Sequence, residues 1–430
     1  MEINRWAQLA AEGYGADREL LTLIRQAEKE EEAAFREIDE ISAYNQLRLL
    51  QIFQEQGVTD FHLGGSTGYG YGDVGREVLE RVFAAYFGGE AALVRCQILS
   101  GTHALAAGLF GNLKRGDELV SAVGTPYDTM LKVIGLHQEE GSLTDSGVSY
   151  KEVPLTEEGR PDTRGLGRAL GPKTKVVLIQ RSKGYQWRAS LALDEVKELI
   201  DVVRQTAPQA LCLVDNCYCE MVDTLEPGYV GADLVIGSLI KNPGGTLAPC
   251  GGYIVGREEY VRRAACRLAA PGLGADLGAS LQFNRSAFQG FFQSPLIVAQ
   301  AVKGARLAAR VFSKLGYEVL PSPKDRNADI VQAIKLGTEE KLLAFCRAIQ
   351  KACPLDAGFV PEPDLLPGYD YPVIMAGGTF IQGSSIELSA DGPLRPPYIV
   401  YLQGGIALGQ IRLGVLLAAG GVSGKNTEKI

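Results

Sequence analysis

The chain has 430 residues, of which 46% are hydrophobic and 22% charged, a composition typical of folded proteins with a sizeable buried core. The formal net charge of -8 at pH 7, with no stripe of Lys and Arg, argues against a nucleic-acid partner. The chain contains no apolar run long enough to span a membrane, and its first residues, MEINRWAQ, do not resemble a signal peptide. We therefore expect a cytoplasmic protein with no membrane partner.

The first predicted element is an N-terminal helical arm. Apolar residues recur at three- and four-residue spacing over residues 17–56, which predicts a helix within an arm covering residues 1–59. From residue 60 to residue 285, short apolar segments alternate with amphipathic helices. This alternation predicts a large α/β domain of parallel strands joined by helical crossovers, with helices on both faces of the sheet. The expected strands are AALVRCQ, DELVSAV, VSYKEV, TKVVLIQ, ALCLVDN, ADLVIGS and CGGYIVG.

The C-terminal part of the chain predicts a smaller α+β domain over residues 286–430. A long helix is expected over SPLIVAQAVKGARLAARVFSKLG, followed by strands in YEVLP and PPYIVYL. Two further helices are expected near residues 338–351 and 405–418. The overall prediction is an α/β fold with a mostly parallel sheet and a second, smaller domain.

Ligands of open parallel sheets lie beyond the carboxyl ends of the strands, so the residues that end each strand are the first candidates for a site. In RCQILSGTHALAAGLFG the segment Ser100-Gly101-Thr102 leads from a strand directly into a helix. The backbone N–H groups at such a helix start form a natural phosphate cradle. The alternative is an ordinary N-cap, since Ser and Thr are common there.

Two charged residues follow the next strands. Asp215 ends the apolar segment ALCLVDN, where a carboxylate is costly unless a positive group pairs with it; a capping role is the alternative. Lys241 lies three residues after Ser238, before an Asn-Pro-Gly-Gly turn. Its alternative is a surface lysine whose stem packs on the protein. Neighbouring strands would place Asp215 and Lys241 at one edge of the sheet.

A phosphate cradle, a buried carboxylate and an isolated lysine at one sheet edge together indicate pyridoxal 5'-phosphate as the cofactor. The cradle would take the phosphate, Asp215 would keep the pyridine nitrogen protonated, and Lys241 would form an imine, or Schiff base. Ser238 would add a hydroxyl to the phosphate. We expect neighbouring groups to lower the pKa of Lys241 toward the range of a nucleophile.

The sequence contains two other patterns that could bind a ligand, a glycine-rich loop and a group of cysteines. GYGYGDVG contains the glycine spacing of dinucleotide-binding loops, but no clear strand precedes it and the strand after its helix does not end on an acidic residue. Among the eight cysteines, Cys212, Cys217 and Cys219 lie close in sequence, but no histidine is near them. We therefore expect reduced cysteines and no metal site.

The segments SGTHA, VDNCYCE, GSLIKNPGG and QIRLGV resemble the fold-type I pyridoxal-phosphate enzymes of sulfur amino-acid metabolism. More narrowly, GYGYGDVGRE, ALVRCQILSGTHA and SLIKNPGG resemble the methionine gamma-lyase and cystathionine beta-lyase related proteins known as aluminium resistance proteins. The similarity covers residues 60 to 418, approximately. It implies a pyridoxal-phosphate-dependent carbon-sulfur lyase that acts on an amino acid such as cystathionine, cysteine or methionine.

The resemblance also implies roles for single residues. Lys241 is similar to the Schiff-base lysine and Asp215 to the partner of the pyridinium. Gly101 and Thr102 are similar to the backbone phosphate binders, which Ser238 assists.

Further roles come from the same resemblance. Tyr127, in GTPYDTM, resembles the tyrosine that stacks on the cofactor ring and passes a proton. Arg412 resembles the arginine that holds the substrate carboxylate, a role that suits its two-pronged guanidinium. Tyr69 and Tyr71 resemble the tyrosine region that reaches the phosphate of a neighbouring subunit. They imply a homodimer or homotetramer with shared active sites.

The chain also departs from the well-studied lyases. Glycines stand where those enzymes carry an arginine near the tyrosine, and Ser-Leu-Ile-Lys replaces their Ser-Ala-Thr-Lys. SGTHA is also similar to aldolases of the same fold in which a histidine stacks on the ring, so His103 competes with Tyr127 for this role; a core or capping histidine is a third interpretation. An aldolase, an aminotransferase, or a cofactor-holding protein of low activity therefore stays an alternative to the lyase.

Overall fold

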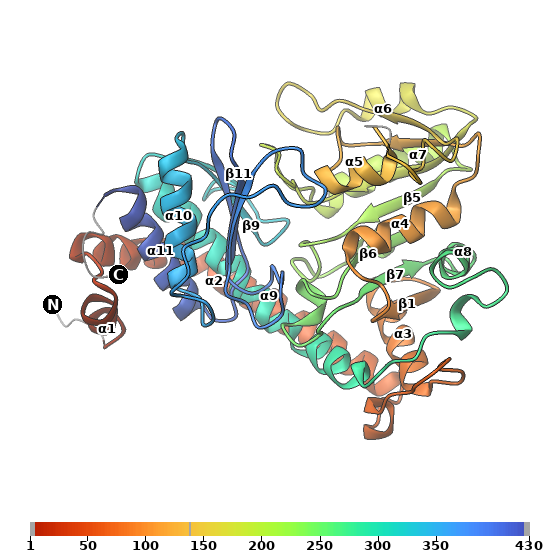
Figure 1. Ribbon diagram of the computed structural model, residues 1–430, viewed down its shortest axis with the longest axis horizontal. Helices are drawn as coiled ribbons and strands as arrows, with labels where there is room; N and C mark the ends of the chain where they lie inside the picture. Colours follow the sequence, from red (N-terminus) through yellow and green to blue (C-terminus); the bar gives the residue numbers. More distant parts are fainter. Residues whose placement is uncertain (1–4, 137–138, 425–430) are drawn as a thin grey trace. The chain divides into compact units, whose positions relative to one another are not determined.

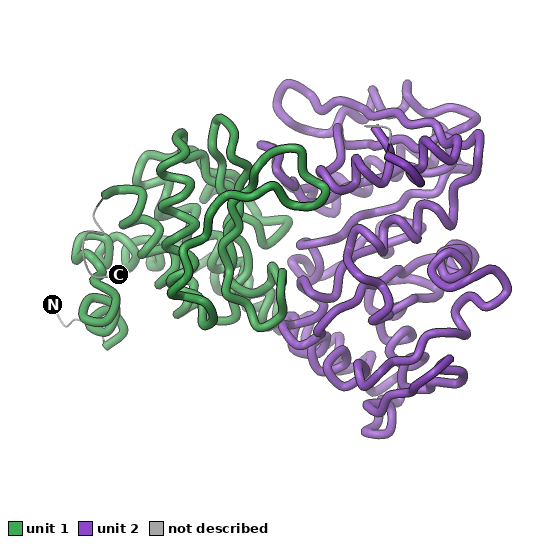
Figure 2. The backbone as a smooth tube through the Cα atoms, viewed as in Figure 1, with its two compact units in different colours: residues 1–42, 296–430 green, residues 43–295 purple. Residues whose placement is uncertain are grey.

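The computed structural model describes residues 5–136 and 139–424. The chain divides into two compact units, one formed by residues 43–295 and the other by residues 1–42 together with 296–430 (Figure 2). Both boundaries fall inside long helices, α2 (Arg18–Glu55) and α9 (Phe283–Lys314). The sequence suggests a division into residues 1–59, 60–285 and 286–430, whose boundaries differ from those of the two units. That division of the chain into an arm and two domains stays a prediction.

The larger unit contains a seven-stranded sheet in the order β1-β7-β6-β5-β4-β2-β3 (Figure 1). Neighbouring strands from β6 to β3 run parallel, so the predicted mostly parallel α/β fold is confirmed. Each of the seven expected segments holds one strand. The strands are β1 (Ala91–Arg95), β2 (Glu118–Ser121), β3 (Ser149–Glu152), β4 (Thr174–Gln180), β5 (Leu211–Asp215), β6 (Leu234–Ser238) and β7 (Gly252–Gly256).

Strand β7 does not follow the predicted parallel arrangement. It pairs antiparallel with both β6 and β1. Only residues 239–251 connect β6 to β7, and they form the short turn η3 (Asn242–Gly244) instead of a crossover helix. Because a parallel return usually needs a crossover helix, and this connection forms only a short turn, the chain turns back on itself here. This turn carries Lys241.

Helices cover both faces of the large sheet, because successive strand residues point to opposite sides. Along β4, Val176 and Leu178 belong to the core with α4 and α8, whereas Val177 and Ile179 belong to the core with α6 and α7. The helices of this unit are α3 (Val74–Phe87), α4 (Gly101–Asn112), α5 (Asp128–Ile134), α6 (Thr163–Ala169), α7 (Leu193–Thr206) and α8 (Glu258–Leu268), with short turns η1 (Asp60–Leu63), η2 (Pro227–Val230) and η4 (Gly274–Asp276).

The smaller unit contains an antiparallel five-stranded sheet in the order β10-β11-β12-β9-β8. The strands predicted in YEVLP and PPYIVYL and the helices predicted near 338–351 and 405–418 are confirmed, whereas β9, β10 and β11 were not predicted. The elements are β8 (Glu318–Leu320), β9 (Val331–Lys335), β10 (Val373–Ala376), β11 (Ser389–Pro393), β12 (Ile399–Gln403), α1 (Arg5–Tyr14), α10 (Glu339–Lys351) and α11 (Leu408–Val422).

Two features are absent from the residues that the structure describes, a membrane-spanning helix and a metal-binding cluster. None of the helices in residues 5–136 and 139–424 is both long enough and apolar enough to cross a membrane. Within the same ranges, no group of three or more His, Cys, Asp or Glu side chains is arranged to hold a metal ion.

Candidate active site

The first part of the candidate site is the start of helix α4. Ser100 caps this helix, and its Oγ accepts the backbone N–H of His103 at 3.1 Å. A Cβ added at Gly101 would lie 3.2 Å from Sγ of Cys217 and 3.3 Å from Cβ of Ser238, so the helix start lies closely against the end of β6. The structure thus brings the predicted cradle and Ser238 together, and it adds Cys217, which sequence reasoning did not assign to the site.

The N–H groups of this cradle are unused. Among the described residues, no acceptor is bonded to the backbone N–H of Gly101 or Thr102. The first N–H groups of a helix have no partner within the helix, and together with the helix dipole they favour an anion. An orphaned pair of donors beside the hydroxyl-bearing Ser238 is a donor set that fits a phosphate group.

Asp215 ends β5, beside β6. Its side chain is 5% exposed, and Oδ1 accepts the backbone N–H of Cys217 at 3.1 Å. Burial raises the pKa of Asp215, while the charge of Lys241 and the hydrogen bonds from Cys217 act in the opposite direction. A buried carboxylate of this kind is stabilised by a positive partner, which fits the predicted pairing with a protonated ring nitrogen.

Lys241 lies against an aromatic ring that the sequence analysis did not assign to the site. Its Nζ is 3.9 Å from the centroid of the Tyr218 ring, within the range of a cation–π interaction. Tyr218 has a φ of 72°, a left-handed conformation that is uncommon for a residue with a side chain and is found at functional sites. In the sequence, Tyr218 stands out only as the aromatic residue between Cys217 and Cys219. This pattern did not predict its contact with Lys241.

The acidity of Lys241 differs from the expectation. Burial lowers its pKa, but Cys217, Tyr218 and Asp215 more than offset burial, so the pKa is raised well above its usual value. We attribute the rise at neutral pH to Asp215, because burial also raises the pKa of Cys217 and keeps its thiol uncharged. The expected lowering was wrong for the chain alone, since the groups whose charges act on Lys241 are acidic.

Tyr127 lies next to the cradle. Its hydroxyl is 3.2 Å from Oγ1 of Thr102, and its backbone N–H donates to Oε1 of Gln180 at 3.0 Å. Burial, followed by the charges of Asp215 and Cys217, raises the pKa of Tyr127 well above its usual value. Tyr127 is therefore a neutral phenol that has a proton to donate. It lies close enough to Asp215 for the charge of the carboxylate to raise its pKa.

His103 is engaged in the local structure of the helix start. Its Nδ1 accepts the backbone N–H of Leu99 at 3.0 Å. Burial lowers the pKa of His103 below its usual value, which favours the neutral ring needed for this acceptor role. The geometry agrees with the capping interpretation of His103, and the stacking of Tyr127 or His103 on the cofactor ring stays a prediction.

Arg188 is a positive group near Asp215 that the sequence analysis missed. Its guanidinium donates to the carbonyl oxygens of Gln180 at 2.9 Å and Ser182 at 2.6 Å, and its charge acts to lower the pKa of Asp215. Arg188 lies in the segment after β4, far from Asp215 in sequence. Only the pairing of β4 with β5 brings the two together.

Tyr69 and Tyr71 are exposed on a firmly held loop of the same unit. Their exposed fractions are 71% and 61%, and their ring centroids are 5.6 Å apart. The guanidinium of Arg76 donates to the carbonyl oxygens of Gly70 at 2.8 Å and Gly278 at 2.6 Å, and the N–H of Gly278 donates to the carbonyl of Tyr69 at 3.0 Å. The tyrosine loop and the segment near residue 278 therefore hold each other in place.

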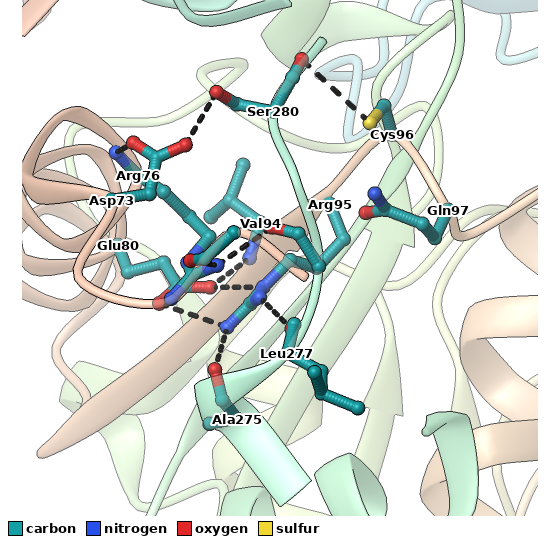
Figure 3. A network of polar contacts seen from close by, with 12 residues as sticks. Asp73, Arg76, Glu80, Val94, Arg95, Cys96, Gln97, Ala275, Leu277 and Ser280 are labelled. Atoms are coloured by element: carbon teal, nitrogen blue, oxygen red, sulfur yellow. Dashed lines mark hydrogen bonds and ion pairs between the residues drawn. The ribbon is translucent and has the colours of Figure 1, made fainter. Parts of the chain in front are cut away.

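Figure 3 shows the buried polar network beneath this loop. Asp73 accepts hydrogen bonds from Ser280 at 2.5 Å and from the backbone of Arg76 at 2.9 Å. Arg95 pairs with Glu80 at 2.6 Å and donates to two carbonyl oxygens in residues 275–277. The network joins segments separated by about two hundred residues, so no local pattern in the sequence could have revealed it.

Arg412 is the one candidate residue that belongs to the smaller unit. It lies near the start of α11, and its Nε donates to Oε1 of Glu28 at 2.5 Å. The guanidinium also lies over the ring of Trp6, 4.7 Å from its centroid. The structure therefore gives Arg412 an ion pair and a stacking partner of its own, and its predicted role as the binder of the substrate carboxylate stays a prediction.

The residues present fit pyridoxal phosphate. The unbonded N–H groups and the Ser238 hydroxyl can donate hydrogen bonds to its phosphate. The buried Asp215 can pair with its protonated ring nitrogen, and Lys241 can react with its carbonyl. These groups come from the ends of β5 and β6 and the start of α4, as expected for a ligand at the edge of an open sheet.

Comparisons with known proteins identify similar sequences and solved structures. A family model described as methionine gamma-lyase matches residues 20–422. An uncharacterised protein of Bacillus subtilis, YnbB, is 48% identical over 385 residues, which cover 89% of this chain and 91% of YnbB. The solved structure of a carbon-sulfur lyase involved in aluminium resistance from Clostridium novyi is 42% identical, with a TM-score of 0.93 over 97% of this chain and 99% of that one.

A more distant likeness concerns the fold alone. Cystathionine gamma synthase from Xanthomonas oryzae is 17% identical, with a TM-score of 0.57 over 85% of this chain and 93% of that chain. The mostly parallel sheet with its helical layers is therefore shared with enzymes whose sequences have diverged widely.

Proposed function

Because the chain belongs to the methionine gamma-lyase family of pyridoxal-phosphate-dependent lyases, we propose that it releases sulfur from a sulfur-containing amino acid. The bond broken would be the carbon-sulfur bond at the beta or gamma carbon of a substrate such as cystathionine, cysteine or methionine. The pyridoxal-phosphate cofactor and the lyase class predicted from the sequence are confirmed by the family. The substrate and the position of the bond are our proposal.

The observation that carries the proposal is the cluster of Lys241, Asp215 and Tyr127 beside the unused N–H groups of α4. Bound pyridoxal phosphate would supply an electron sink for the negative charge that forms on the substrate when its alpha proton leaves. The N–H groups of Gly101 and Thr102, with the hydroxyl of Ser238, would hold the phosphate. The carboxylate of Asp215 would hold a proton at the ring nitrogen.

Two side chains would move protons. Nζ of Lys241 is the base that would accept the proton from the alpha carbon of the amino acid. The neutral hydroxyl of Tyr127 is the acid that would protonate the departing sulfur. Arg412 would bind the substrate carboxylate if it exchanged Glu28 for the substrate.

We further propose a homodimer or homotetramer in which Tyr69 and Tyr71 reach the phosphate of a neighbouring subunit, in the cytoplasm. Two large aromatic side chains with exposed fractions of 71% and 61% on an anchored loop support this assignment. Exposed aromatic groups at a fixed position are suited to protein interfaces.

The test is a panel of amino acids incubated with the purified protein, with release of ammonia, keto acid and thiol measured. Cystathionine, cysteine or methionine should give these products, and Lys241→Ala should not. If all sulfur amino acids were inert while a beta-hydroxy amino acid gave glycine and an aldehyde, the aldolase alternative would replace the lyase. Keto acid formed without loss of sulfur would indicate an aminotransferase. If no substrate were turned over, the result would indicate a cofactor-holding protein of low activity.

A further inference from the structure

Glu220 is a buried carboxyl group that the proposed reaction does not use. Its side chain is completely buried, and Oε1 accepts the hydroxyl of Tyr253 at 2.8 Å. A Cβ added at Gly237, the residue before Ser238, would lie 2.7 Å from the same Oε1. Glu220 therefore lies directly against β6, where only a glycine leaves room for its carboxyl group.

The main chain of Glu220 is linked to the turn that carries Lys241. Nδ2 of Asn242 donates to the carbonyl oxygen of Glu220 at 2.9 Å. Asn242 follows Lys241 directly and begins the turn η3, so its side chain fixes the backbone on which the lysine is mounted. Any change in the Glu220–Asn242 contact is thus expected to change the position of Lys241.

Glu220 and Asn242 each also have one buried side-chain oxygen without a hydrogen-bond partner in the part of the chain that the structure describes. Among the described residues, neither Oε2 of Glu220 nor Oδ1 of Asn242 has a donor. Leaving a buried acceptor unsatisfied costs about 1–3 kcal/mol, and more for a charged group. A carboxylate can only accept, whereas a neutral carboxyl group has one O–H to donate. A proton on Glu220 would therefore supply one O–H donor, and the oxygen of Asn242 is a buried acceptor without one among the described residues.

The charges around Glu220 agree with a neutral form. Burial raises its pKa to about 8. A hydrogen bond from its own backbone N–H and the hydrogen bond from Tyr253 act to lower this pKa, the charge of Glu226 acts to raise it and the charge of Lys241 acts to lower it. Glu220 in turn contributes to the raised pKa of Tyr253 and of the Cys217 thiol. At neutral pH Glu220 therefore retains its proton.

We propose that Glu220 is a positioning residue that works in its neutral, hydrogen-bond-donating form to hold Asn242 and so the turn that presents Lys241. The proposal rests on the proposed function in one respect, the role of Lys241 as the residue that takes the cofactor. Loss of the Glu220 proton would remove the O–H donor proposed for the Asn242 oxygen and add a buried negative charge. The turn would then be held less firmly, and the lysine ammonium would be held more strongly by negative charge. Cofactor binding should then weaken as Glu220 ionises.

The experiment measures the affinity of the cofactor-free protein for pyridoxal phosphate between pH 6 and pH 9.5 by its absorbance. For a group with a pKa of about 8, the neutral fraction falls about tenfold between pH 7 and pH 9. The affinity of the wild-type protein should fall about tenfold more over this range than that of Glu220→Gln, whose amide donates at every pH. Equal pH dependence in the two proteins would overturn the proposal, because every other titrating group is common to both.

The matched control is Glu226→Gln. Glu226 is also buried with a raised pKa, but both of its oxygens already accept hydrogen bonds, from the N–H of Met221 and the side chain of Asn216. This variant should keep the pH-dependent fall, with its midpoint moved to lower pH because the negative neighbour of Glu220 is gone. If Glu226→Gln abolished the fall in affinity for pyridoxal phosphate with rising pH, the titrating group would be Glu226 and not Glu220.

Tyr253→Phe keeps the proposal testable if Glu220→Gln fails to fold. Loss of the Tyr253 hydroxyl removes a hydrogen bond that stabilises the Glu220 carboxylate, so the midpoint should move to higher pH. An unmoved midpoint would overturn the proposal. If the wild-type protein bound no pyridoxal phosphate at any pH, or bound it on another lysine, the proposed function of Lys241 would be refuted. This outcome differs from the outcomes that would overturn the role of Glu220.

Discussion

The hydroxyl of Tyr127 lies 3.2 Å from Oγ1 of Thr102, so the loop after β2 and the start of α4 meet at one point. The backbone N–H of Tyr127 is held by Gln180, which ends β4. Three neighbouring parts of the sheet edge therefore fix a single phenol beside the unused N–H groups of the helix. The arrangement places a proton donor next to the proposed phosphate site, at the edge of the sheet where the substrate of the proposed elimination would bind.

Lys241 is expected to carry pyridoxal phosphate. The charge of Asp215 acts on Lys241, and the anion site at α4 lies beside Ser238 at the end of the same strand, so this lysine is suited to the cofactor. Treatment of the loaded protein with borohydride should bleach its colour and join the cofactor irreversibly to the peptide that contains Lys241, which mass spectrometry identifies. An adduct on another lysine would refute the assignment.

Asp215→Asn should retain pyridoxal phosphate but lose most of the activity. An amide does not stabilise a proton on the ring nitrogen, so the electron sink is weaker. Asp233→Asn is a matched control, because Asp233 is a buried carboxylate that immediately precedes β6 and pairs with Arg204 at 2.6 Å. The control should lower the melting temperature without changing the cofactor spectrum. Near-normal turnover by Asp215→Asn would contradict the role.

The sequence predicted the large sheet well and the site in part. The strand ends Asp215 and Ser238 were predictable, because apolar runs define strands and open sheets bind ligands at their carboxyl edge. Tyr218 and Glu220 were not, because their roles depend on the tight turn after β5 and on contacts with Lys241 and Tyr253, which are distant in sequence. Tertiary contacts of this kind leave no periodic pattern.

The smaller unit shows the same limit. The strands β9, β10 and β11 are short, and β11 (Ser389–Pro393) reads SADGP, which contains residues that are depleted in strands. Pairing with β10 and β12 gives this segment its extended form. Propensity alone therefore favoured a loop where the sheet imposes a strand.

Arg412 provides a test of binding against structure. If it binds the substrate carboxylate, Arg412→Ala should raise KM at least tenfold while leaving the resting cofactor spectrum unchanged. Glu28→Gln is its matched control, because it removes the 2.5 Å ion pair and leaves the guanidinium in place. Glu28→Gln should leave KM unchanged or lower it. If both variants instead lower the melting temperature equally and KM is unaffected, Arg412 only stabilises the unit formed by residues 1–42 and 296–430.

The stability of the protein should fall as pH rises from about 4.5 to about 8. Burial raises the pKa of Glu220 to about 8 and that of Glu226 to about 7, so the folded chain retains protons that the unfolded chain has already released in this window. The stabilising effect of these protons is complete below the unfolded pKa and is lost as pH passes the folded values. Urea unfolding of the cofactor-free protein at several pH values should show a shallower decline for Glu220→Gln than for wild type. Identical slopes would mean that Glu220 is already ionised at low pH.

Tyr127→Phe tests the proton donor of the proposed reaction. Tyr127 is a buried phenol whose raised pKa keeps it neutral, and its hydroxyl contacts Thr102 at the anion site. The substitution keeps the ring, and with it any stacking on the cofactor, but removes the proton that the departing sulfur needs. General acid catalysis contributes about a hundredfold to ten-thousandfold, so kcat should fall by at least a hundredfold while KM changes little.

The leaving group decides between a proton-donating and a structural role for Tyr127. An acidic thiol leaves without a proton, so a substrate with an activated aryl thiol should be cleaved by Tyr127→Phe almost as fast as by wild type. Thr129→Val is the control, because Thr129 also contacts Oγ1 of Thr102, at 3.0 Å, but has no proposed part in proton transfer. An equal loss of activity with good and poor leaving groups would mean that Tyr127 only shapes the site. His103→Gln should then be compared on beta-hydroxy amino acids, since the aldolase alternative needs that residue as the ring partner.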